Sequence, residues 1–263
     1  MQYLEQQILN NPKQALKMQQ VENATREFLS QGDARVVDGI ITIPVVVHVV
    51  WNTAAENISD EQIQSQITIL TEDFRRLNSD ANNNWPQAAD AEIEFCLAGS
   101  DPNGNTTNGI TRTQTSVTSF STNDNVKFDA TGGKDAWPSS QYLNFWVCDL
   151  GGGLLGYAQF PGGPANTDGI VCDYQYVGNI GTATPPYHLG RTATHEVGHW
   201  LNLRHIWGDG GCGVDDLVAD TPVSDAPNFS CPTGHVSCGS TDMIENYMDY
   251  THDDCMNLLT LGQ

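Results

Sequence analysis

The chain has 263 residues, 39% of them hydrophobic, which allows one large domain or two subdomains around a cleft. Eleven basic residues against 32 acidic residues give a formal net charge of −21, which argues against nucleic acid or an anionic membrane as a partner. The charge favours cations, either metal ions or peptides rich in Arg and Lys, although solubility alone explains much of it. No apolar run approaches the roughly 20 residues of a membrane span, so we expect no membrane insertion.

Residues 1–35 are polar and rich in Gln and Asn, and they predict helical pieces without a core of their own. They are either a pro-segment, cleaved at or near Arg35, or an ordinary N-terminal arm. Asp33 is a candidate zinc ligand in a latent form. The first residues lack the basic and apolar regions of a signal peptide, so we expect that an export signal was removed and that Met1 is an expression start.

A strand and a helix are predicted next along the chain. Residues 41–51 are almost all β-branched and predict a central strand, inside which His48 is expected to be a hydrogen-bonded core residue. Residues 59–77 carry apolar side chains at four-three-four-three spacing. This spacing predicts an amphipathic helix with Ser59 or Asp60 as its N-cap.

More strands are expected before the helix that carries the histidines. They are predicted at 91–98, 142–150 and 169–174, with surface loop and irregular strand in 99–125. A short apolar segment flanked by glycines, 154–158, lies between the last two strands. Three cysteines lie in these apolar runs and are expected to be buried free thiols: Cys96, Cys148 and Cys172. Strand, helix and several strands before a further helix predict an α/β upper half.

The segment HEVGHWLNLRH, from His195 to His205, has the spacing of a zinc hydrolase. Residues i and i+4 share one face of a helix, so His195 and His199 can bind one metal from consecutive turns. Glu196 then lies beside the metal without binding it, where it can accept a proton from water. The helix must stop and the chain must turn back for His205 to reach the same metal. Three protein ligands leave tetrahedral zinc a fourth position for water, which is the catalytic arrangement.

The same motif followed by Met248 in a tight turn resembles the metzincin signature, in which this Met lies under the zinc as a hydrophobic floor. Asn202 stands where metzincins usually have Gly, at the point where the helix ends and the chain bends. Asn is the next most tolerant residue for a left-handed backbone, so the bend is expected to survive the change.

Among the metzincins, four longer segments of the chain resemble the pappalysin family. The resemblance covers residues 40–263. The segments are YLNFWVCDLGGGLLGYAQFPG at 142–162, HEVGHWLNLRHIWGD at 195–209, VDDLVADTP at 214–222 and NYMDY at 246–250. The resemblance implies a metzincin-type catalytic domain at 36–263. Its upper α/β subdomain, 36–202, would hold a twisted mixed sheet and the active-site helix. Its lower subdomain, 203–263, would be irregular, rich in loops and disulfide-bonded.

Four cysteines lie among loops that are rich in Gly, Pro and Asp and cannot form much core: Cys212, Cys231, Cys238 and Cys255. Disulfides there would contribute about 2–4 kcal/mol each, and the sequence alone allows three pairings. A second zinc site is the alternative, although the spacing lacks a CxxC. The resemblance implies the pairs Cys212–Cys238 and Cys231–Cys255.

Five aspartates crowd the same stretch and would repel one another without a cation: Asp209, Asp215, Asp216, Asp220 and Asp225. Calcium takes several oxygen ligands, including carbonyls from irregular backbone, so we expect structural calcium as a second metal. The alternative is a solvated acidic loop. The resemblance points to Asp209, Asp216 and Thr221 near calcium, with a carbonyl from around Ala219.

The predicted function is that of a secreted zinc endopeptidase. Tyr250 matches the metzincin tyrosine that donates to the tetrahedral oxyanion, and one such donor can be worth about 3 kcal/mol. Metzincins hold an extended peptide by strand addition to an edge strand, which Leu154, Leu155 and Gly156 would begin here. Two other functions stay open: a zinc and calcium binding module without catalysis, against which Glu196 speaks, and a zinc hydrolase of a non-peptide amide.

Asp253 matches the position that pappalysin relatives use at the base of the pocket for the residue just after the scissile bond. A carboxylate there would bind Arg, bidentately, and less well Lys. We therefore expect cleavage of protein or peptide substrates on the N-terminal side of Arg. The protein is also expected to be a monomer. The alternative is that Asp253 is solvated or binds calcium.

Overall fold

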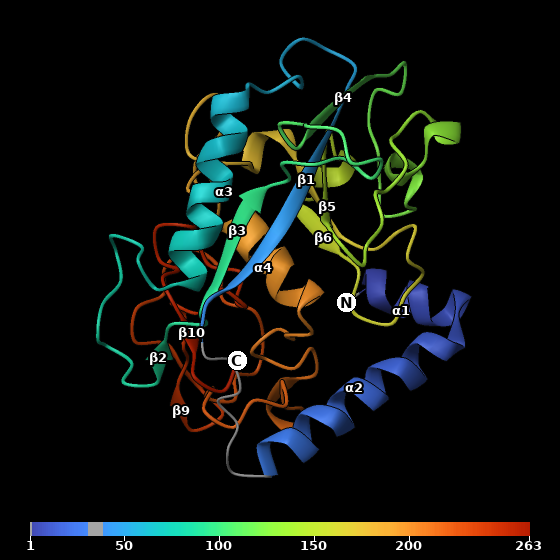
Figure 1. The fold of residues 1–263 in the computed structure, drawn as a ribbon. Helices are drawn as coiled ribbons and strands as arrows, with labels where there is room; N and C mark the ends of the chain where they lie inside the picture. The colour runs from blue at the N-terminus through green and yellow to red at the C-terminus, as the bar shows by residue number, and fades with distance from the viewer. Residues whose placement is uncertain (1, 31–38) are drawn as a thin grey trace.

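The structure, a computed structural model, describes residues 2–30 and 39–263. The predictions for Asp33 and Arg35 concern positions outside these residues. Its centre is a six-stranded sheet with strand order β3-β1-β5-β7-β6, in which β4 also pairs with β1 (Figure 1). This is the α/β fold that the strand and helix patterns predict, with the mixed sheet that the family resemblance implies.

The central strand β1, Ile41–Trp51, organises the sheet, as its β-branched sequence predicts. Its first half pairs in parallel with β3, Ile93–Leu97, and its second half with β4, Ile110–Gln114. Its other edge pairs in parallel with β5, Leu143–Cys148. β7, Ile170–Asp173, continues the parallel order, and the edge strand β6, Gly156–Ala158, runs antiparallel to it.

Both faces of the sheet are buried at its centre, where alternate side chains of β1, β5 and β7 enter different cores. One face packs against the helices α3, Asp60–Phe74, and α4, Arg191–Trp200. The other packs against the chain between β4 and β5. His48 is fully buried on this second side, where its ring nitrogens lie 2.8 Å from Thr111 Oγ1 and 3.1 Å from Asn144 Oδ1. This burial and the two contacts confirm the predicted core role, and burial lowers the pKa of His48 to about 4.

Helix α3 begins where the sequence predicts and ends earlier. The Ser59 side chain accepts a hydrogen bond from the Gln62 backbone N–H, so Ser59 is the N-cap. The helix ends at Phe74 rather than Leu77, because Arg76 adopts a left-handed backbone with φ 49°. Leu77 is 64% exposed, so its place in the apolar spacing was misleading.

The chain after α4 is mostly irregular. Its strands are β8, Val236–Ser237, and β9, Ser240–Thr241, which pair with each other, and β10, Leu259–Thr260, which pairs with β2, Ala88–Ala89, of the upper half. Short 3₁₀ turns lie at Asn125–Lys127, Asp129–Thr131, Gly151–Gly153, Tyr174–Tyr176 and Gly211–Gly213. The disulfides Cys212–Cys238 and Cys231–Cys255 are both formed, as predicted.

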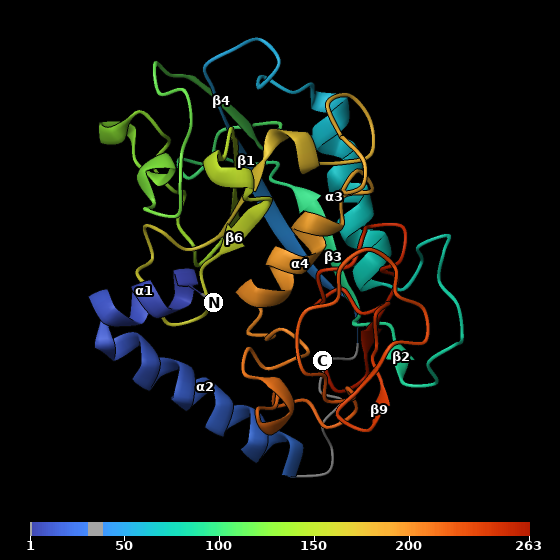
Figure 2. The same ribbon diagram turned by 180° about the vertical axis from the view of Figure 1, so that it is seen from behind.

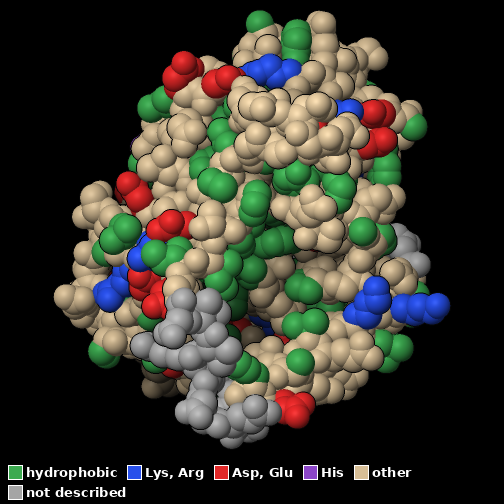
Figure 3. All heavy atoms as spheres, in the orientation of Figure 1, with side chains coloured by type: hydrophobic (Ala, Val, Ile, Leu, Met, Phe, Trp, Pro, Cys, Tyr) green, Lys and Arg blue, Asp and Glu red, His purple; other side chains and the backbone are tan. Residues whose placement is uncertain are grey.

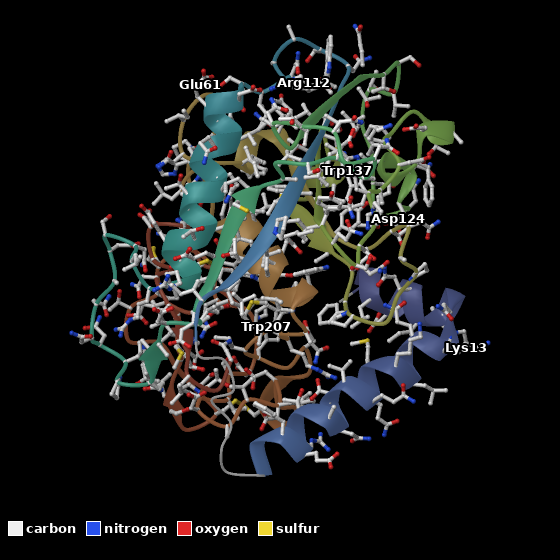
Figure 4. The ribbon with its side chains drawn as sticks, viewed as in Figure 1. Lys13, Glu61, Arg112, Asp124, Trp137 and Trp207 are labelled. Atoms are coloured by element: carbon white, nitrogen blue, oxygen red, sulfur yellow. A yellow bond between two sulfur atoms is a disulfide. The ribbon has the colours of Figure 1, made fainter. Side chains whose placement is uncertain are left out.

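Two N-terminal helices, α1, Gln2–Asn10, and α2, Pro12–Ser30, form a hairpin beside the rest of the protein (Figures 1 and 2). The hairpin has no core of its own. Its buried Leu4 and Met18 pack instead on Phe160, which follows β6. Lys13, labelled in Figure 4, lies on the exposed side of the hairpin.

The exposure of one cysteine differs from the prediction that all three thiols are buried. Cys148 and Cys172 are buried thiols, but Cys96 is exposed. β3 is an edge strand whose Phe95 faces α3, so the next side chain, Cys96, points to the opposite face.

On the face of Figure 1, hydrophobic side chains gather along the middle and most charged side chains lie at the margins (Figure 3). No helix among the described residues is long and apolar enough to cross a membrane.

Candidate active site

The three histidines of the motif converge on one point. Helix α4 presents His195 and His199 from consecutive turns, and both are 7% exposed. Asn202 then adopts φ 81°, the left-handed bend that the sequence predicts, and the chain returns to bring His205 beside them. One ring nitrogen from each of the three lies within 4.8 Å of the others, and Nε2 of His199 is 3.0 Å from Nε2 of His205.

Hydrogen bonds on the other ring nitrogens orient the three imidazoles. His195 Nδ1 lies 2.7 Å from the Tyr247 carbonyl oxygen, and His199 Nδ1 lies 2.8 Å from that of Leu203. A carbonyl oxygen can only accept, so each Nδ1 carries the proton and donates it. Both Nε2 atoms therefore keep a free lone pair aimed at the shared point.

The Nδ1 atom of His205 lies 2.8 Å from the carboxylate oxygen Oδ1 of Asp209. Asp209 therefore orients a histidine, although the resemblance placed it near calcium. Trp207 supports the same ring, since its indole stacks on His205 with centroids 4.2 Å apart and planes 6° apart. Figure 4 labels Trp207 below α4.

The chemistry of this donor set fits a zinc ion. Burial lowers the pKa of His195 to about 4 and those of His199 and His205 well below their usual value. The three rings are therefore neutral, which is the form that binds metal. Three converging imidazoles with oriented outer nitrogens are typical of a catalytic zinc site with one open position.

Glu196 lies between the histidines and the edge strand β6. It is 7% exposed, and burial raises the pKa of its carboxyl to about 8. The strand approaches it closely at Gly156, where an added Cβ would lie 3.1 Å from Glu196 Oε1 and 2.9 Å from the Val171 carbonyl oxygen. Gly156 therefore gives β6 its position beside the carboxylate.

Met248 lies beneath the histidine helix in a fully buried turn. Its sulfur reaches the helix at Gly198, where an added Cβ would be only 2.3 Å from Met248 Sδ. The turn also supplies the Tyr247 carbonyl that orients His195. Met248, the predicted floor under the metal, therefore packs directly against Gly198 of the histidine motif.

Tyr250 lies at the rim of the site, with its ring 5.4 Å from that of His195 and 4.8 Å from that of His205. Its side chain is 37% exposed, and burial raises the pKa of the phenol above its ordinary value. The phenol therefore stays protonated at neutral pH and remains a hydrogen-bond donor.

A cavity of about 320 Å³ opens beside Glu196 and Tyr250, and Asp253 lines it. Asp253 is 1% exposed, and its Oδ2 accepts hydrogen bonds from the backbone N–H groups of Leu189 and Arg191. Burial raises the pKa of Asp253 to about 6. Leu154, Leu155 and Gly156 line the same cavity from the side of β6.

Arg191, which anchors the start of α4, was not predicted from the sequence. The guanidinium forms ion pairs with Asp73 of α3, at 3.1 Å, and with Asp80, at 3.2 Å. It also donates to the Met256 carbonyl oxygen, and the Tyr247 hydroxyl donates to Asp73. The network ties the two helices to the Met248 turn. A single Arg before the histidine motif does not indicate such a network in the sequence.

Two further contacts were within reach of the sequence. Gly198 is a poor helix former in the middle of a predicted helix, which usually marks close packing. Asp209 follows His205 at the spacing of a local pair, but the surrounding aspartates favoured calcium instead.

Comparisons with known proteins agree with this geometry. The family model for pregnancy-associated plasma protein-A matches residues 126–263. An extracellular metalloprotease of Arthroderma benhamiae is 34% identical over 85% of this chain and 74% of its own length. Among solved structures, Tannerella forsythia mature mirolysin in complex with a cleaved peptide is 55% identical, with TM-score 0.82 over 86% of this chain and 89% of its own. A mutant of T. forsythia promirolysin is 50% identical, with TM-score 0.88 over 98% and 88%.

The fold and the three histidines define a metzincin-type zinc metalloendopeptidase. The chain belongs to the pappalysin family.

Gly198→Ala should destabilise the protein. Replacing an exposed helix glycine with alanine normally stabilises by up to about 1 kcal/mol, but the added methyl group here meets Met248 Sδ. Urea denaturation should show a lower free energy of unfolding for the variant. In a Gly198→Ala/Met248→Ala double variant the loss should be smaller than the sum of the single losses. Additive losses would show that the two residues do not pack together.

Proposed function

We propose that the protein is a secreted zinc endopeptidase, made as a zymogen, that cleaves on the N-terminal side of Arg and less well Lys. One observation carries the proposal. Three neutral imidazoles converge beside a buried carboxylate, between an open edge strand and a pocket that contains Asp253.

Each group has a role in this mechanism. Zinc held by the three histidines would polarise the scissile carbonyl and acidify the attacking water. Glu196 accepts the proton of that water and later delivers it to the leaving amine. Its burial beside the histidines places the carboxylate where it can reach both groups. Tyr250 donates its hydroxyl hydrogen to the developing oxyanion.

The edge strand β6 would bind the substrate backbone by strand addition. β6 pairs with β7 on one side only, so its other edge can take an extended peptide. Because β6 lines both the Asp253 cavity and the histidine cleft, a peptide along it would pass directly over Glu196. An extended peptide fits this arrangement better than a small non-peptide amide does.

Asp253 would select a cationic residue just after the scissile bond. Its Oδ2 is held by two backbone N–H donors, which fixes the carboxylate in place at the cavity. A second carboxylate, that of Asp249, lines the same cavity. Arg suits the site better than Lys because its planar guanidinium can pair with a carboxylate through two hydrogen bonds.

Residues 1–35 would be the pro-segment and 36–263 the catalytic domain, with subdomains 36–202 and 203–263. The hairpin of α1 and α2 lies beside the cleft, and the promirolysin structure matches more of this chain than the mature mirolysin structure does. Relatives named extracellular metalloproteases support secretion. The mass of the active form would test the boundary, and light scattering would test the proposed monomer.

Calcium would bind in the lower subdomain at Asp209, Asp216 and Thr221, with a carbonyl from around Ala219. Asp216 is 5% exposed, and burial raises its pKa to about 7. Its oxygens lie 2.8 and 2.9 Å from Thr221 Oγ1. Asp209 Oδ1 also contacts His205 Nδ1, and backbone carbonyls and water would complete the ligand set.

Glu196→Ala should leave zinc bound but lower peptide hydrolysis about 10²- to 10⁴-fold, because it removes the base and spares the ligands. A quenched-peptide assay with metal analysis would measure both. His205→Ala is the contrasting variant and should lose zinc on dialysis. Near-normal turnover by Glu196→Ala would rule out the mechanism.

Asp253→Asn should lower kcat/KM for Arg peptides about 10²-fold, equivalent to about 2.7 kcal/mol, and much less for neutral peptides. Asn keeps an oxygen for the two backbone donors and removes the charge. Asp253→Ala, which also loses the backbone contacts, should show at least the same loss of selectivity. Equal losses on both kinds of peptide would mean that Asp253 does not select the cation.

The preference for Arg should also depend on pH. Asp253 faces the Arg191 guanidinium and the His188 ring, and burial raises its pKa to about 6. Below that pH the carboxyl is protonated, so the ratio of kcat/KM for Arg over neutral peptides should fall as pH drops through 6. The ratio cancels changes shared by both substrates, such as titration of the histidines. In Asp253→Asn the change of the ratio with pH should be much smaller. Any remaining change would come from Asp249, which lines the same cavity and whose pKa burial raises to about 6.

Removal of calcium under conditions that spare zinc should lower the Tm and expose the lower subdomain to added proteases. Asp216→Asn should give a similarly low Tm that added calcium does not raise. Calorimetry with metal analysis would measure this. An unchanged Tm after confirmed calcium loss would contradict a structural calcium site.

A further inference from the structure

The cleft continues past the histidines on the side away from Asp253. A second cavity there, of about 300 Å³, is lined by His199, His205, Ala158 and Phe160. Phe160 packs on the ring of His199, with centroids 5.0 Å apart, so this apolar surface adjoins the metal ligands directly.

A side chain of the N-terminal hairpin already occupies the edge of this cavity. Leu4 of α1 lines it and is 8% exposed, and it forms one apolar cluster with Met18 and Phe160. The hairpin is held there by more than this contact. Asn202 Nδ2 donates to Glu22 Oε1 at 2.8 Å, and α2 packs so closely on Gly162 that an added Cβ there would lie 2.7 Å from Lys17 Cβ.

The direction of β6 shows which part of a substrate would meet this surface. The start of β6 lines the Asp253 cavity and its end leads to Phe160. A peptide that adds antiparallel to β6 runs the opposite way. Its residues before the scissile bond therefore lie at Phe160, and those after it lie at Asp253.

We propose that Phe160 forms an apolar subsite for residues before the scissile bond, and that Leu4 fills this subsite until the hairpin leaves. The inference rests on the proposed peptidase function and extends it to the other side of the scissile bond. Once the hairpin leaves, Phe160 is uncovered beside the metal ligands, and an apolar side chain of the peptide takes the place of Leu4. Leu or Phe before the bond would then complement Arg after it.

The first test compares two variants of the full chain. Leu4→Ser should raise the initial rate of peptide hydrolysis about tenfold or more, since it removes the apolar contact with Phe160. Leu9→Ser is the matched control, because Leu9 lies on the same helix and is 75% exposed. Its rate should stay within about twofold of the unsubstituted chain. Mass spectrometry must show that the chains are intact during the measurement.

The second test uses the Leu4→Ser chain and two quenched peptides that both carry Arg after the bond. The two residues before the bond are Leu in one peptide and Ser in the other. The Leu peptide should be preferred about tenfold. In the Leu4→Ser chain, the further substitution Phe160→Ala should abolish this preference, whereas Phe160→Leu should keep much of it. Phe229→Ala, in the Asp253 cavity, should leave the preference for Leu over Ser unchanged. Zinc content and Tm are measured for each variant, because Phe160 contacts His199.

The outcomes separate the two proposals. Equal acceleration by Leu4→Ser and Leu9→Ser, or a preference for Leu that survives Phe160→Ala, overturns the subsite and leaves the peptidase intact. Zinc-loaded, folded chains that cleave neither peptide overturn the peptidase function, and the subsite with it.

Discussion

The site depends on holding three neutral imidazoles with their lone pairs aimed at one buried point. Without a cation this is a costly arrangement, because buried acceptors face one another without donors. The protein maintains it through the opposite edge of each ring. Each Nδ1 bonds to an oxygen from a different segment: the Met248 turn, the end of α4 and the loop that carries Asp209. The fold around the site can be understood as the means of bringing these three oxygens together.

This requirement explains why the two halves of the protein meet at α4. The upper half supplies the helix and fixes its start through Arg191, which is paired with Asp73 and Asp80. The lower half supplies the turn, which can lie close beneath the helix only because residue 198 is a glycine. Gly156 lets the edge strand approach from above in the same way. Gly198 therefore allows the Met248 turn to pack against the helix from below, and Gly156 allows β6 to pack against Glu196 from above.

The sequence predicted those parts of the structure that local patterns encode. The β-branched run of β1, the capped helix α3 and the histidine spacing each follow from short-range rules, and even the bend at Asn202 could be expected. The disulfide pairs and the edge strand came from family resemblance. Contacts between distant segments were not predictable in this way. The pairing of Arg191 with Asp73 leaves no periodic trace, and Gly198 indicates close packing without showing that its partner is Met248. Cys96 was misplaced because an apolar strand does not reveal that it lies at an edge.

The two disulfides have a topological consequence for a protein that hydrolyses peptide bonds. Cys231 lies inside the loop closed by Cys212–Cys238, and Cys238 lies inside the loop closed by Cys231–Cys255, so the two loops overlap. Any single cut of the backbone between Cys212 and Cys255 is spanned by at least one disulfide. The segment holds exposed side chains such as Val214, Leu217 and Val236 and has little regular structure, which makes it an easy target for proteolysis. A molecule nicked there by a neighbouring copy remains covalently one piece, with its Met248 turn still attached beneath the histidines.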